Sequence, residues 1–409
     1  MSPGPGGLWL HRHQRPLFLV ASGLSTSGSF AGLTAKGWIL MAGTGNPLLL
    51  ALHFAALALP SLAVSGRAGV LTDRLGCETM LIRSQWGLFG GAVLGALAIP
   101  LLQGVSQVVV LLLSTLVVGV SSSFELTARS KYCSLLVDRP EEVAPYLASF
   151  SVVFNVGKLV GPPLGGWLVA LSGPAMALAI DAASYLVPIA TVIWLLRPHR
   201  ELEQRSAGGA GASLGAAWRG CGSTLRHVLR FTTVACLVGF FHPGLAPLIA
   251  AEVVGPSPQA LGLFTSVLAA GSICGGVALQ RNSVAFSERP VLLLGTCAVT
   301  VALAQLGMAA ASGSSIALAM TFLIGAGTAG LLAGSSLILQ VGSPMALRGR
   351  MAGLGQIAFL GGGGVSGLVA ATLAMTVGLH ATFALLGGLG LVIGVLELGR
   401  RGSLRLRSA

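Results

Sequence analysis

The sequence predicts an all-α integral membrane protein with twelve membrane-spanning helices, and three observations support this fold class. The chain of 409 residues is 54% hydrophobic and only 9% charged, whereas a soluble domain carries about 25% charged residues. Its apolar residues form runs of the length that a spanning helix needs, which is roughly 20 residues. Its Lys and Arg residues fall in alternate connections between these runs. The outer surface must therefore face lipid.

Twelve apolar runs, separated by polar residues, Gly or Pro, define the expected helices. They cover residues 17–41, 47–66, 80–100, 106–126, 145–171, 174–196, 229–250, 259–280, 290–311, 314–341, 351–373 and 376–398. The longest polar interval divides them six and six, which is typical of two parallel repeats joined by a linker. We expect an N-terminal six-helix bundle at 1–196, a linker at 197–228, and a C-terminal six-helix bundle with a basic tail at 229–409.

The distribution of positive charge predicts the orientation. Of the 24 Lys and Arg residues, 22 lie on one side of the expected spans, and the other two, Lys36 and Lys158, lie within spans. Cytoplasmic connections carry the excess of Lys and Arg. We therefore place the linker and both termini in the cytoplasm. The net charge of +12 is explained by this topology, and no nucleic-acid partner is expected.

The second part of the linker is mixed in character. Trp218, Leu225 and Leu229 alternate there with Arg219, Arg226 and Arg230. Such a segment is either an amphipathic helix lying in the membrane interface or an ordinary tether, and the sequence leaves both interpretations open.

Enzymatic and cofactor-dependent functions are not indicated. The six cysteines show no metal-ligand spacing, so we expect no disulfide and no metal. The stretch from Gly325 to Gly330 matches a dinucleotide-binding fingerprint, but that motif requires a preceding strand. Here it lies inside an apolar run, where glycines allow close helix packing. There is no P-loop sequence and no nucleophile–base pair, so we expect neither a cofactor nor an enzyme.

The connection between the second and third expected spans carries glycines and fixed charges. Glycines permit a tight turn, and Asp73 can accept hydrogen bonds from helix N-termini and arginines. The motif consists of Gly69, Leu71, Asp73, Arg74 and Gly76, with Thr72 between them. It resembles the G-x-L-A-D-R-x-G loop of the major facilitator superfamily, although Cys77 and Glu78 replace the basic pair that usually follows. This resemblance implies two six-helix bundles around a central cavity, alternating access, and a cavity lined by spans 1, 4, 7 and 10.

The fifth expected span contains a second motif rich in glycine and proline. Its members are Asn155, Gly157, Lys158, Gly161, Pro162, Gly165 and Gly166. It resembles the G-x-x-x-G-P-x-x-G-G motif of the exporting, antiporter-type branches of the superfamily. Prolines kink the helix, and we expect the glycines to allow close packing against the opposing half. The motif is interpreted either as a marker of export or as a packing kink without bearing on direction.

A third segment connects spans ten and eleven. Gln340, Arg348 and Arg350 are similar to the Q-x-x-x-P-x-x-x-R-G-R segment of the macrolide-efflux and enterobactin-exporter-like branch. The sequences around Arg139–Glu142 and Asp181–Leu186 resemble the same branch. The resemblance extends from about Arg15 to Arg350 and implies a transporter, without identifying its substrate.

Charged residues within the spans are candidates for functional sites, because each is costly at membrane depth. The candidates are Lys36, Glu125, Lys158, Asp181 and Glu252. Asp181 is expected to pair with Lys36 or Lys158, in a structural or a gating role. Glu125 is either a titrating carboxylate or one half of a salt bridge with Arg129 or Lys131. Glu252 forms a protonatable pair with His242 or simply ends a solvated helix. Span four lacks the intramembrane Arg of many proton-coupled members.

The predicted function is export of a small amphipathic organic molecule, such as a drug-like compound or a siderophore, with proton antiport as the expected coupling. Few charges and several hydroxyl groups line the implied cavity: Ser25, Ser27, Ser29, Thr34, Ser121, Ser122 and Ser123. The alternatives are uptake or lipid flipping, and a non-transporting sensor or scaffold. We expect a monomer in the bacterial plasma membrane, whose partners are the substrate, protons and lipid.

Overall fold

The computed structural model describes residues 5–137, 140–195, 218, 220–281, 289–343 and 348–400, and every regular element in this part of the chain is helical. The helices are α1 (Pro5–Thr44), α2 (Pro47–Ala58), α3 (Pro60–Leu75), α4 (Cys77–Leu101), α5 (Gly104–Leu135), α6 (Pro140–Ala190) with a terminal π-turn (Thr191–Leu195), α9 (Ser223–Gly239), α10 (His242–Val253), α11 (Pro258–Arg281), α13 (Pro290–Ala309), α14 (Ser314–Val341), α15 (Arg348–Val377) and α16 (Leu379–Gly399).

Eleven segments of the described chain are long and apolar enough to cross a membrane. One of them, Val156–Trp194, is 39 residues long and contains a break at Gly173, whose φ of 82° and ψ of 165° are not helical. Glycine adopts this conformation without steric cost. The break separates two spans, so the structure confirms the predicted pair 145–171 and 174–196 and the total of twelve.

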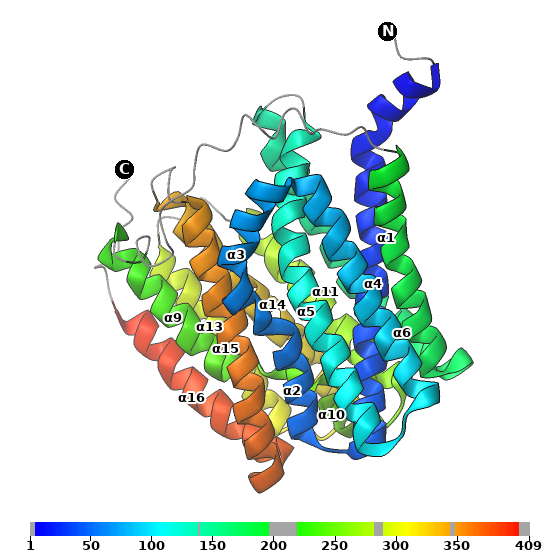
Figure 1. Cartoon of the computed structure of the whole chain (residues 1–409). Coiled ribbons are helices and arrows are strands. Elements are labelled where there is room, and N and C mark those ends of the chain that lie inside the picture. Colours follow the sequence, from blue (N-terminus) through cyan, green and yellow to red (C-terminus); the bar gives the residue numbers. More distant parts are fainter. Residues whose placement is uncertain are drawn as a thin grey trace. The chain divides into compact units, whose positions relative to one another are not determined.

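The chain forms two compact units: residues 1–39 with 63–211, and residues 40–62 with 212–409. In the first unit α4 packs against α5 and α6, and α1 runs beside α6 (Figure 1). In the second unit α13 packs against α14 and α16, α11 packs against α14, and α9 packs against α15. Residues 40–62 belong to the second unit because α2 packs against α10 and α15.

Two spans that we expected to be continuous helices are interrupted before a proline. The run predicted at 229–250 is divided at Phe240 and Phe241, directly before His242-Pro243, and it begins earlier, at Ser223. The run predicted at 47–66 is divided at Leu59, before Pro60. Proline lacks the backbone donor that a continuing helix needs and disfavours helical geometry in the preceding residue.

The connection between α3 and α4 also differs from the expected tight turn. Residues from Gly66 to Leu75 remain helical in α3, and the chain turns only at Gly76, which has a φ of 87°. The amide of Gly76 donates to Thr72 O at 3.1 Å, and Gly76 O accepts from the Met80 amide at 3.0 Å. One glycine is therefore enough to join the two helices. The Asp73 side chain lies outside the described residues.

Candidate functional site

The first unit buries a lysine deep in its interior. Lys36 on α1 is only 4% exposed, and its Nζ donates a hydrogen bond of 2.7 Å to Ser114 Oγ on α5. Ser114 in turn donates to Gly91 O on α4 at 2.7 Å. A Cβ atom on Gly95 of α4 would lie 3.0 Å from the Lys36 Cε, so the glycine leaves room for the lysine stem. Three helices thus hold one ammonium group in place.

A buried carboxylate lies on α6. Asp181 is 3% exposed, and Tyr185 follows it one helical turn further on. Its Oδ1 atom has no hydrogen-bond partner in the described part of the chain. Gly28 and Gly32 on α1 lie against Ser184 and Asp181, because glycines let the two helices approach closely. One oxygen of the carboxylate is therefore available to bind a proton.

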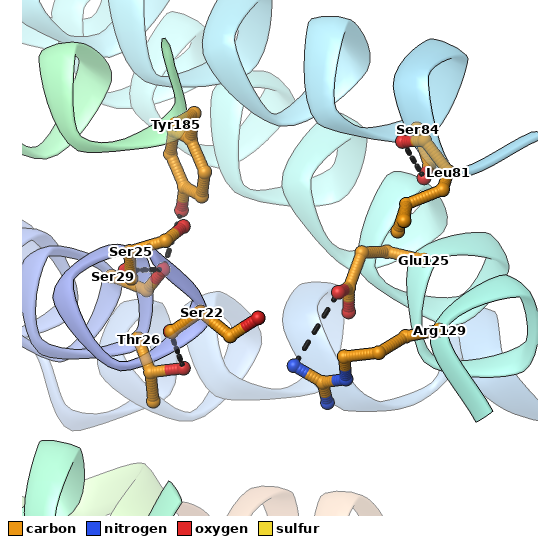
Figure 2. A network of polar contacts seen from close by, with 9 residues as sticks. All are labelled: Ser22, Ser25, Thr26, Ser29, Leu81, Ser84, Glu125, Arg129 and Tyr185. Carbon is orange, nitrogen blue, oxygen red and sulfur yellow. Dashed lines mark hydrogen bonds and ion pairs between the residues drawn. The ribbon is translucent and has the colours of Figure 1, made fainter. Parts of the chain in front are cut away.

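The tyrosine connects this carboxylate to α1. Ser29 Oγ lies 2.9 Å from the Tyr185 hydroxyl and 2.8 Å from Ser25 O, as Figure 2 shows. A hydroxyl donates a single proton. Ser29 therefore donates either to Tyr185 or to Ser25 O, and in the second case the Tyr185 hydroxyl can donate to Ser29. The hydrogen bond between Tyr185 and Ser29 can thus reverse its direction.

The expected pair between Asp181 and Lys36 is indirect. The charges of the two groups act on each other, but no ion pair within 4 Å joins them in the described residues, because Ser114 binds the lysine. Lys158, the alternative partner, is not in an ion pair with Asp181 either. Asp181 and Lys36 therefore form a coupled charge pair across α1, α5 and α6 rather than a salt bridge.

Glu125 and Arg129 form a second charged group, on α5. Glu125 Oε1 lies 3.4 Å from Arg129 Nη1, with the two side chains 10% and 16% exposed. The guanidinium also covers the ring of Phe150 at 5.7 Å, and in Figure 2 it extends toward the part of α1 that carries Ser22. The structure thus contains the predicted salt bridge between Glu125 and Arg129. A buried carboxylate can also bind and release a proton, and this functional role of Glu125 stays a prediction.

The glycines of the fifth-span motif pack against a different partner from the one expected. Gly157, Gly161 and Gly165 recur every four residues of α6, and a Cβ atom on each would collide with α1. On Gly161, for example, it would lie 2.6 Å from Phe30 Cβ. Residues four apart share one helix face. This motif therefore joins α6 to α1 inside the first unit, rather than packing against the opposing half.

Other predicted site residues lie at helix ends. Glu252 ends α10 and lies 3.9 Å from His380 Nδ1 on α16, with side chains 43% and 60% exposed, so its partner is His380 and not His242. The side chains of Asn155, Gln340, Arg348 and Arg350 lie outside the described residues. Whether these motif residues take part in function stays a prediction.

The second unit contains a neutral polar group that the sequence analysis missed. Gln305 on α13 is 0% exposed, and its Nε2 lies 3.3 Å from Val238 O, 3.4 Å from Gly239 O and 3.4 Å from His242 Nε2. These carbonyls lose their helical partners where α9 ends. The Gln305 amide therefore supplies a hydrogen-bond donor to the carbonyls at the break between α9 and α10. It also lines a small apolar pocket. A glutamine in an otherwise apolar run was the available signal.

Ser114 and Tyr185 were also not singled out as site residues. The pair Ser114-Thr115 interrupts the apolar residues between Gln107 and Ser121, and a hydroxyl in the middle of such a run is a usable signal. Tyr185 follows Asp181 at the i,i+4 spacing that lets two side chains on a helix interact. Neither pattern predicts which helix supplies the partner, which depends on tertiary packing.

The arrangement defines a class of protein: a multi-pass helical membrane transporter with charges buried among its spans. The fold is the major facilitator fold. The chain resembles a D-xylose–proton symporter with a TM-score of 0.78 over 98% of this chain and 99% of that one, at 12% identity. It resembles the nucleoside transporter NupG with a TM-score of 0.73 over 94% and 98% of the two chains, also at 12% identity.

The model of the transmembrane secretion effector family matches residues 12–406, and the chain belongs to this family of the major facilitator superfamily. The multidrug efflux pump Tap of Mycolicibacterium fortuitum is 27% identical over 395 residues, which cover 93% of this chain and 94% of the relative. Tap of Mycobacterium tuberculosis is 23% identical over 382 residues, or 90% and 88% of the two chains. The protein is thus a transporter of the bacterial plasma membrane, as the sequence predicts.

Proposed function

We propose that this protein exports small amphipathic organic molecules from the cytoplasm by alternating access, with protons moving in the opposite direction. The support for export comes from relatives that match nearly the whole chain and are named multidrug efflux pumps. Both termini lie in the cytoplasm in this proposal, since 22 of the 24 Lys and Arg residues lie on that side. The working unit is a monomer of two six-helix bundles.

The observation that carries the coupling proposal is Asp181, a buried carboxylate with an unpartnered oxygen. An acidic residue inside a span is expensive and is by default a functional site. In the proposed cycle, Asp181 binds a proton when its side of the pathway is open to water, and the nearby Lys36 charge favours release of that proton when the site closes. Tyr185 and Ser29 reverse their hydrogen bonds as the proton arrives and leaves.

The proposed preference for amphipathic substrates follows from the polar groups of α1 in the first unit. The hydroxyls of Ser27 and Thr34 are bonded to carbonyls of their own helix, α1, which leaves mainly apolar surface for contact with a substrate. Apolar pockets with a few polar groups suit drug-like ligands. Sugars and polyanions need many more directional partners, so we place drug-like molecules ahead of them as substrates.

Proteoliposomes with an imposed pH gradient test the proposal. We expect the wild-type protein to accumulate a lipophilic cationic dye or a comparable amphipathic compound only when the gradient is present. Asp181→Asn should remove the response to the gradient, whereas the matched variant Glu252→Gln, which changes an exposed carboxylate, should keep it. If the wild-type protein accumulates the compound to the same extent with and without the pH gradient, transport is not proton-coupled.

The alternatives predict different results in the same vesicles. An uptake transporter would carry the compound against the expected direction in vesicles of known orientation. A lipid flippase would move a fluorescent phospholipid between leaflets and ignore soluble compounds. A sensor or scaffold would do neither.

A further inference from the structure

The start of α9 carries two arginines that have no carboxylate partner among the residues that the structure describes. Arg226 and Arg230 lie one helical turn apart, and no Asp or Glu forms an ion pair with either in the described residues. The Nε atom of Arg226 is buried and makes no hydrogen bond. A buried donor without an acceptor is destabilising, so an acceptor from outside the described residues would stabilise Arg226.

A tryptophan completes this site. The guanidinium of Arg230 lies 5.7 Å from the ring centroid of Trp218, and the indole packs against the buried core of the second unit. Tryptophan is enriched at the depth of lipid headgroups. The spanning segment that contains α9 begins at Ser223. Both arginines therefore lie within its first turns, near the membrane interface.

An exposed apolar residue lies beside the arginines. Val234 follows Arg230 by one turn and is 42% exposed, as expected for a residue that contacts acyl chains. A molecule with an anionic head and a hydrocarbon tail would place its head at Arg226 and Arg230 and its tail along Val234. A free phosphate ion would match only the first half of this surface.

We propose that Arg226, Arg230 and Trp218 bind the phosphate group of an anionic phospholipid. Arginine suits this role because its planar fork binds phosphate oxygens in a bidentate way. The free amides of the first turn of α9, where Gly222 supplies no side-chain cap, add positive potential at the same end. This site is separate from the buried charges of the first unit, and it does not depend on the proposed direction or coupling of transport.

Native mass spectrometry of the full-length, delipidated protein tests the proposal, with phosphatidylglycerol, phosphatidylcholine and inorganic phosphate as probes. A juxtamembrane arginine contributes about fivefold to the affinity for an anionic surface. We expect Arg226→Gln and Arg230→Gln each to weaken phosphatidylglycerol binding by about fivefold, and the double variant by about 25-fold. Arg281→Gln is the matched control, since Arg281 is an exposed arginine at the end of α11, and it should bind as the wild-type protein does.

Three results would overturn the proposal. Arg281→Gln could weaken binding as much as Arg226→Gln, which would indicate a diffuse charge effect. Phosphatidylcholine could bind as tightly as phosphatidylglycerol. Inorganic phosphate could displace the lipid, which would indicate a free anion as the ligand. If Arg226→Gln fails to fold, Arg226→Lys replaces it in the test: it should weaken phosphatidylglycerol binding and leave the thermal stability in lipid-free detergent unchanged.

Discussion

The two units differ in where along their spans they bury ionisable side chains. Within its spans the first unit holds ionisable side chains, with Lys36, Glu125 and Asp181 all less than one-tenth exposed. The second unit buries the carboxylate of Glu397 only at the end of α16, where it lies 2.7 Å from His227 Nε2; at the break in its own first span it holds the neutral amide of Gln305 and the imidazole of His242. Charges inside a membrane protein are far more costly than amides. In our proposal the mid-span charges of the first unit are the ones that act in coupling, while Gln305 of the second unit stabilises an interrupted helix.

Packing does not separate the two units in this way. Gly157 and Gly161 of α6 lie directly against α1, and Gly271 and Gly275 of α11 lie equally close to α14. Both pairs of helices use small residues four positions apart to bring backbones together. The two units therefore share a means of packing and differ in where their buried charges lie.

The largest expected effect comes from removing one member of the buried charge pair. Asp181→Asn leaves the buried Lys36 ammonium without its nearby negative charge, and an uncompensated buried charge is strongly destabilising. We expect a clear loss of thermal stability in purified protein. Adding Lys36→Met to this variant should recover part of the loss, with a coupling energy of at least about 1 kcal/mol. Purely additive effects in this cycle would show that the two charges are independent.

The next largest effect tests the shared packing. Gly161→Val and Gly275→Val both place side-chain atoms against a neighbouring helix, and overpacking costs about 1–3 kcal/mol. We expect similar losses of melting temperature in the two variants. Gly90→Ala is the control, because no atom lies within 4 Å of the added Cβ, and it should be neutral or slightly stabilising. A loss confined to one unit would contradict the similarity of their packing.

The neutral group of the second unit should affect stability without affecting coupling. Gln305→Leu removes the donor that Val238 O and Gly239 O share, and unsatisfied buried groups cost about 1–3 kcal/mol. We expect a lower melting temperature, measured in detergent, and an unchanged response of transport to the pH gradient. A loss of that response would place an ion-dependent step in the second unit as well.

The smallest effect is expected at the exposed ion pair of the second unit. Glu252 and His380 are 3.9 Å apart and largely solvated, and such pairs contribute below about 1 kcal/mol. Glu252→Gln should leave both the melting temperature and transport close to wild-type values at neutral pH. A large loss of transport would make Glu252 a functional residue and would weaken the contrast between the units.

The sequence was informative about this fold because a bilayer constrains composition so strongly. Run length and charge patterning predicted the twelve spans, including the division at Gly173, and the loop residues from Gly69 to Gly76 correctly indicated the superfamily. The breaks before Pro60 and Pro243 were missed because apolar composition continues across them. The helical continuation of α3 as far as Leu75 was missed because glycine and charge were taken as turn signals.

The candidate site was less predictable than the fold. Burial cost alone identifies Asp181 and Lys36 as unusual, since each is a charge inside an apolar run. The bond from Lys36 to Ser114, and the place of Tyr185 between Asp181 and Ser29, depend on which faces of α1, α5 and α6 meet. A single sequence does not contain that information. The same is true of Gln305, whose partners are the carbonyls of a break that was not predicted.

Proton release on substrate binding tests most directly whether the buried charges of the first unit couple transport to protons. The purified protein is mixed with a saturating amphipathic substrate in weakly buffered detergent, and a pH-sensitive dye reports the protons set free. The wild-type protein and Gln305→Leu should each release up to about one proton per molecule, since binding is linked to a change in protonation. Asp181→Asn should release none. Equal release from Asp181→Asn and the wild-type protein would contradict the assignment of coupling to Asp181.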